Sequence, residues 1–130
     1  MDEATFKRRT RELGLRVIEM TRSMKRDLAS DVLARQIVRS ATSVGANYRA
    51  ACRAKSRADM LMKLSIVEEE ADETTHWLEM LRDSNSVPAE VTNPILAEAN
   101  EITAMTVASI RTLRVSAANP KSKVQSPKFK

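Results

Sequence analysis

Apolar residues recur at intervals of three and four along most of the chain, which is the spacing of one face of an α-helix. The first stripe predicts a helix over residues 3–26 and consists of Phe6, Leu13, Val17, Met20 and Met24. Ser30 and Asp31 are suited to begin a second helix, since a short polar side chain there can accept a backbone amide. That helix is predicted to end near Lys55, and its stripe consists of Leu33, Ile37, Ala41, Val44 and Tyr48.

The third stripe is the most regular, with gaps that alternate between four and three residues. Ser56 to Asp59 resembles a capping box at its start. Residues 83–86 form a predicted turn at its end. The long helix between them is predicted to bury Met60, Leu64, Val67, Ala71, Thr74, Leu78 and Leu81.

Two prolines complicate the last helix. A proline in a helix interior removes a hydrogen bond and clashes with the preceding turn. We therefore predict a short turn over residues 88–92, with Asn93 as the cap and Pro94 as the first helical residue. The inner stripe beyond it consists of Ile95, Ala99, Ile102, Met105, Ser109 and Leu113.

The predicted fold class is all-α. Connections of a few residues favour antiparallel neighbours, so we expect an up-down-up-down four-helix bundle. The bundle is predicted to occupy residues 1–117. Residues 118–130 hold lysine, proline and serine without any acidic residue, and are predicted to be a flexible basic tail.

Composition leaves little room for enzyme chemistry. The 130 residues include 2 glycines, too few for a glycine-rich phosphate loop. The single cysteine, Cys52, excludes an internal disulfide and favours a cytoplasmic location. No apolar run approaches the length of a membrane span. Glu73 and His76 have the Glu-x-x-His spacing of di-iron bundles, but the chain has one histidine. We predict no catalytic residue, no metal site and no cofactor.

Charge is divided along the chain. Residues 1–57 carry 14 basic and 6 acidic side chains, so this part is basic. Residues 58–110 carry 2 basic and 11 acidic side chains, and residues 111–130 carry 6 basic and no acidic side chains. The two signs could neutralise one another within the bundle or between copies of the chain. The other interpretation is a basic surface for a polyanion such as nucleic acid.

The second helix carries a basic line on the side opposite its apolar stripe. Its members recur at helical intervals and are Arg35, Arg39, Thr42, Ala46, Arg49 and Arg53. Lys55 and Arg57 extend the basic region past the helix end. Guanidinium groups suit phosphate recognition. The alternatives are an ordinary solvated face, or pairing with the acidic block Glu68–Glu73 of the third helix.

Other small and apolar residues indicate close packing. Gly45 in a helix interior is destabilising by about 1 kcal/mol relative to alanine, and a close backbone approach would explain it. Trp77, Met62 and Met80 lie off the core stripe, which favours self-association.

Two stretches resemble a known family. Residues 39–49, read as RSATSVGANYR, with ACRAKS at 51–56, resemble the signature of the bacterial four helix bundle protein family, which is also known from intervening sequences of large-subunit ribosomal RNA genes. EADET at 70–74, with Trp77 and Leu78, resembles its second block. The family is also similar to the accessory protein of diversity-generating retroelements.

The resemblance implies a non-enzymatic bundle that assembles as a ring, a homopentamer. For the retroelement relative it also implies binding of nucleic acid and of a reverse transcriptase. Arg39, Arg49 and Arg53 fall within the matching motif, whereas Arg35 and the tail lysines rest on charge alone.

We therefore expect a ring-forming bundle that binds RNA or DNA through Arg35, Arg39, Arg49, Arg53, Lys55 and Arg57, helped by the lysine tail. The alternative is a homo-oligomeric protein-interaction scaffold without nucleic-acid binding, in which carboxylates engage all of these arginines.

Overall fold

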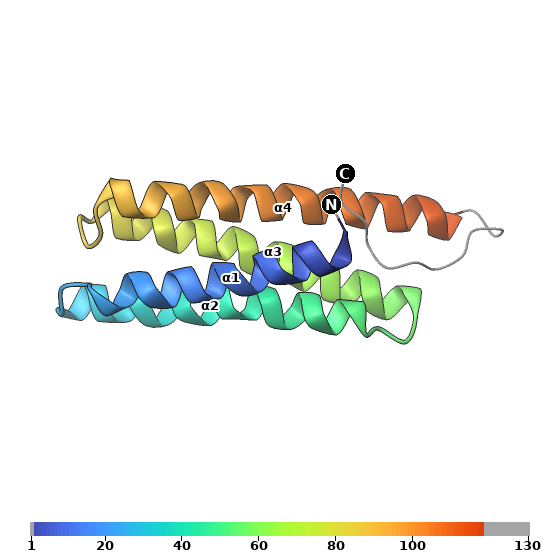
Figure 1. The fold of residues 1–130 in the computed structure, drawn as a ribbon, viewed down its shortest axis with the longest axis horizontal. Coiled ribbons are helices and arrows are strands. Elements are labelled where there is room, and N and C mark those ends of the chain that lie inside the picture. Colours follow the sequence, from blue (N-terminus) through green and yellow to red (C-terminus); the bar gives the residue numbers. More distant parts are fainter. Residues whose placement is uncertain (1, 119–130) are drawn as a thin grey trace.

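The computed structural model describes residues 2–118, which form four antiparallel helices. They are α1 (Glu3–Arg22), α2 (Leu28–Cys52), α3 (Arg57–Asp83) and α4 (Ala89–Ala118). The α1–α2 and α3–α4 loops lie at one end of the elongated bundle and the α2–α3 loop lies at the other (Figure 1). The predicted up-down-up-down bundle is confirmed. Residues 119–130 of the predicted tail lie outside the described residues.

The core is built from the predicted stripes. Nearly every stripe residue is buried, and Met24, Leu33 and Met105 are partly buried at its edge. Phe6 of α1 and Tyr48 of α2 are fully buried, with ring centroids 4.8 Å apart in an edge-to-face arrangement. Burying an aromatic ring is strongly favourable, so this pair helps to hold α1 against α2.

The helix starts follow short polar caps. The side chains of Asp2, Asp27 and Ser56 each accept a hydrogen bond from the backbone amide three residues on. Because Asp27 takes this role, α2 begins three residues before the predicted Ser30–Asp31 start. The first helix ends at Arg22 rather than at residue 26. In the turn after α3, Asn85 has a φ of 62°, a backbone conformation that asparagine tolerates well.

The predicted start of the last helix is wrong. α4 begins at Ala89 and contains Pro94, so residues 88–92 are not a separate turn with Asn93 as cap. The backbone amides of Val91 and Thr92 donate to the carbonyl of Pro88, which starts the helix. Burial of Thr92 and Ile95 holds the first turns on the core, while Pro94 lies on the exposed side. There, water can satisfy a carbonyl that lacks its helical donor, so the proline is tolerated.

The two glycines mark a close crossing of α1 and α2. A Cβ atom on Gly45 would lie 3.2 Å from the carbonyl oxygen of Thr10 and 3.3 Å from the backbone of Arg11. A Cβ on Gly14 would lie 3.4 Å from the backbone of Ala41 and Thr42. The predicted close approach at Gly45 is therefore confirmed, and its partner is α1.

An ion-pair cluster joins α1 to α4 across the bundle. The Arg9 Nε atom donates to Glu98 Oε2 at 2.9 Å, and Arg9 Nη2 lies 3.0 Å from Glu101 Oε1. The side chains of Arg9 and Glu98 are 16% and 20% exposed, so water weakens this pair little. Arg9 of α1 is thus paired with two carboxylates of α4 within one chain.

Candidate nucleic-acid interface

The basic line of α2 faces away from the core, as predicted. Arg35, Arg39, Arg49 and Arg53 are all exposed, as are Thr42 and Ala46 between them. The two ends of the line have different surroundings: Arg39 lies against α3, whereas Arg49 and Arg53 lie beside α1. The four arginines are therefore not equivalent.

Arg39 is engaged by the acidic block of α3. Its Nη1 lies 3.3 Å from Glu70 Oε2, and its Nη2 donates to Glu73. Glu73 also accepts a hydrogen bond from Trp77 Nε1 at 3.1 Å. The carboxylates raise the pKa of the Arg39 guanidinium, chiefly through the hydrogen bond to Glu73. At this position the structure shows the pairing between basic and acidic helices that the sequence left open.

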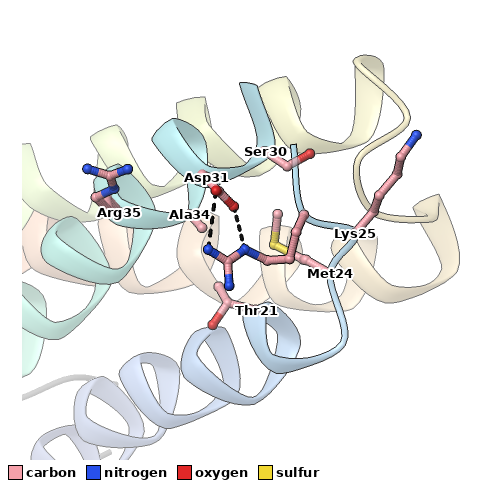
Figure 2. A pocket seen from close by; sticks show the side chains of 8 residues that line it. Thr21, Met24, Lys25, Ser30, Asp31, Ala34 and Arg35 are labelled. Carbon is pink, nitrogen blue, oxygen red and sulfur yellow. Dashed lines mark hydrogen bonds and ion pairs between the residues drawn. The ribbon is translucent and has the colours of Figure 1, made fainter. Parts of the chain in front are cut away.

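Arg35 borders a small pocket of about 240 Å³ at the α1–α2 loop (Figure 2). Within it the Arg26 Nε atom donates to Asp31 Oδ1 at 2.8 Å. This hydrogen bond lowers the pKa of Asp31, and the positive charge of Arg35 makes a smaller contribution in the same direction. Arg35 itself lies to one side of the Arg26–Asp31 pair and is exposed. The pocket therefore holds a satisfied ion pair beside one outward-facing arginine.

Arg49 and Arg53 line a larger open groove between α1 and α2, with a volume of about 520 Å³. Lys7 and Arg11 of α1 line the same groove. Its remaining wall is small or apolar and consists of Thr10, Gly14, Leu15, Ile18, Thr42, Gly45 and Ala46. We call Lys7, Arg11, Arg49 and Arg53 the groove cations.

The groove cations lie at one end of the groove. The Gly14 and Gly45 contacts set the antiparallel register, which places Lys7 level with Arg49 and Arg11 level with Gly45. At a rise of about 1.5 Å per residue, the four charges fall within about 12 Å along the helix axes. Across the part of the chain that the structure describes, no carboxylate pairs with any of them. Such a cluster is poised to bind an anion.

Two of the groove cations were not among the predicted site residues. Lys7 and Arg11 are four residues apart on α1, so they share one exposed face. The sequence shows that spacing. The close crossing at Gly14 and Gly45 determines that α2 lies beside this face of α1, and in which register. Of the other predicted residues, Lys55 is exposed in the α2–α3 loop and Arg57 is partly buried at the start of α3.

The environment of the Cys52 thiol does not favour reactivity. Burial raises the pKa of the Cys52 thiol to about 11, with a further contribution from a hydrogen bond to Glu3. A thiol in that state is a weak nucleophile at neutral pH. Cys52 lies partly buried against the core.

Glu73 and His76, which share the Glu-x-x-His spacing, are directed to other partners. Glu73 binds Arg39 and Trp77, and the exposed His76 ring lies edge-to-face with Trp77 at 4.7 Å. Among residues 2–118, no group of three or more histidine, cysteine, aspartate or glutamate side chains is placed to hold a metal ion. A bilayer-spanning apolar helix is likewise absent from this part of the chain.

The chain is similar to known proteins in both sequence and fold. A crystal structure of a protein of unknown function from the S23 ribosomal protein family of Bacteroides thetaiotaomicron is 33% identical, covers 85% of this chain and 99% of its own, and superposes with a TM-score of 0.76. No curated protein matches the chain. The family model described as 23S rRNA-intervening sequence protein matches residues 3–108, which include all four groove cations. The chain therefore belongs to the 23S rRNA-intervening sequence protein family.

Proposed function

We propose that this protein is a non-catalytic, ring-forming four-helix bundle that binds RNA or DNA through its α1–α2 face. The observation that carries the proposal is the set of four groove cations, which have no described carboxylate partner although acidic residues are plentiful elsewhere in the bundle. Arginine and lysine on an open groove are the donors that phosphate recognition uses. Arg35 and Lys55 would extend the contact surface at its two ends.

The acidic face of α3 supports the ring. Glu69 and Asp72 are exposed and have no ion pair among the described residues. A ring is built from heterologous contacts, in which one patch meets a different patch on the next copy. An acidic face that meets basic residues outside the groove satisfies that requirement, and repeated copies would multiply weak phosphate contacts. We expect a homopentamer, as the family resemblance implies, acting in the cytoplasm. A reverse transcriptase or another protein is a further candidate partner.

The Arg39 network favours a second candidate function. Two carboxylates of α3 already engage this arginine within one chain. If acidic residues of another copy engaged the groove cations in the same way, the protein would be an interaction scaffold without nucleic-acid binding. The two functions differ in what the groove cations contact, so one pair of variants separates them.

The double variant Arg49→Gln/Arg53→Gln is expected to bind nucleic acid about tenfold to a hundredfold more weakly than the unmodified protein. Each glutamine removes one phosphate contact while keeping most of the stem. Both positions are exposed, so the melting temperature should change little. The measurement is fluorescence anisotropy with a labelled mixed-sequence RNA at low salt, accompanied by light scattering to give the mass in solution.

The control is Arg111→Gln/Arg114→Gln, which removes the same charge from an exposed face of α4. It is expected to bind within about twofold of the unmodified protein. Equal weakening by both double variants would show a general charge effect and contradict the proposed interface. Loss of the oligomer in Arg49→Gln/Arg53→Gln, with no RNA bound by either this variant or the unmodified protein, would establish the scaffold function instead.

A further inference from the structure

We infer that the α1–α2 groove recognises the phosphate backbone of a nucleic-acid duplex and does not read bases. This inference rests on the proposed function and names its ligand more narrowly. Two features of the groove carry it, the direction of the aromatic rings and the hydrogen bonds of its hydroxyl groups, together with the density and rigidity of a duplex's charge.

The aromatic rings of α1 and α2 are turned inward. Phe6 and Tyr48 are fully buried against each other, and Trp77 is partly buried on α3. None of the residues described as lining the groove is aromatic. Proteins that hold single strands gain roughly 1–3 kcal/mol for each base stacked on a ring. This groove offers no ring to an unpaired base.

The hydroxyl groups in the groove are already committed to their own helices. Thr10 Oγ1 donates to the carbonyl of Lys7 at 3.0 Å, and Thr42 Oγ1 donates to the carbonyl of Val38 at 2.6 Å. The other uncharged residues of the groove wall carry only aliphatic side chains or none. Base edges are read by side-chain donors and acceptors. Apart from its four cations, whose charge favours phosphate, the groove therefore presents no uncommitted side-chain donor to a base edge.

A site that acts through charge alone favours the ligand with the denser and better ordered charge. A duplex carries one negative charge for about every 1.7 Å of its axis, and one strand carries half as many. Over the short length of the cation cluster a duplex is rigid, because its persistence length is about 150 base pairs. A flexible strand loses conformational entropy when it is ordered on the protein, and no stacking offsets that loss. The balance predicts preference for the duplex.

The test compares two labelled RNAs with the same number of phosphates: a duplex of about 20 base pairs and an unstructured strand of about 40 nucleotides. The full-length protein is expected to bind the duplex about tenfold more tightly than the strand, and a duplex of scrambled sequence within about twofold of the first. The variant Arg49→Gln/Arg53→Gln should lose most of this preference. The control Arg111→Gln/Arg114→Gln should keep it.

Three results would overturn the inference. Equal or tighter binding of the strand would refute the duplex preference and leave nucleic-acid binding intact. Discrimination of more than about tenfold between the two duplex sequences would show that bases are read. Binding of neither RNA at low salt, with duplex DNA of the same sequence equally inert, would refute the proposed function together with the inference.

Discussion

Replacing Gly45 with leucine is expected to lower the free energy of unfolding by about 2 to 3 kcal/mol. The first side-chain carbon would already lie 3.2–3.3 Å from backbone atoms of Thr10 and Arg11. Backbone cannot change rotamer to relieve the contact, so α1 must move away from α2. The gain in helix propensity over glycine, about 0.8 kcal/mol, offsets only part of this loss. Chemical denaturation monitored by circular dichroism gives the value.

The matched control is Ala46→Leu, which adds a similar side chain at the neighbouring, exposed position. It should change the free energy of unfolding by no more than about 0.5 kcal/mol. Equal stability of the Gly45→Leu and Ala46→Leu variants would show that the helices do not cross closely at Gly45. Because α1 and α2 together form the groove, Gly45→Leu should also weaken RNA binding.

The second large effect is expected at the Arg9 ion pair. Arg9→Met removes the guanidinium but keeps an apolar stem beside Met105, whose sulfur lies 3.6 Å from Arg9 Nη1. The substitution leaves Glu98, which is 20% exposed, without its bidentate partner. Removing one member of a buried ion pair is strongly destabilising, and partial exposure reduces the loss here to about 2 kcal/mol of unfolding free energy.

A double variant separates pairing from packing. Arg9→Met/Glu98→Leu removes both charges and is expected to recover at least half of the stability lost by Arg9→Met alone, because no uncompensated charge remains. Thermal unfolding of the unmodified protein, the two single variants Arg9→Met and Glu98→Leu, and the double variant measures the coupling energy between the two side chains. A double variant less stable than Arg9→Met would indicate that Glu98 contributes through packing, and that the ion pair is not what holds α1 to α4.

The helices could be predicted because burial follows a strict period. The stripe from Met60 to Leu81 is buried throughout, and Ser56 caps α3 as its sequence suggested. The start of α4 could not be placed in the same way. A local rule assigns Pro94 to the first turn, whereas burial of Thr92 and Ile95 against the other helices extends α4 back to Ala89. Tertiary packing outweighs one missing hydrogen bond on the exposed side.

The site was only partly predictable for a related reason. Helical spacing shows which arginines share a face, and Arg35, Arg39, Arg49 and Arg53 are all exposed as expected. Which of them acquire partners depends on the register between helices. That register places Arg39 against Glu70 and Glu73, and places Arg49 and Arg53 opposite α1. Lys7 and Arg11 join the site only through that register.

The salt dependence of RNA binding tests the central claim most directly. The logarithm of the association constant, plotted against the logarithm of salt concentration, falls by about 0.9 for each phosphate contact with a duplex. The slope for Arg49→Gln/Arg53→Gln should therefore be shallower than that of the unmodified protein by about 2 or more, with more expected if several copies contact one duplex. Identical slopes for the two proteins would show that these arginines do not contact phosphate, and would contradict the account.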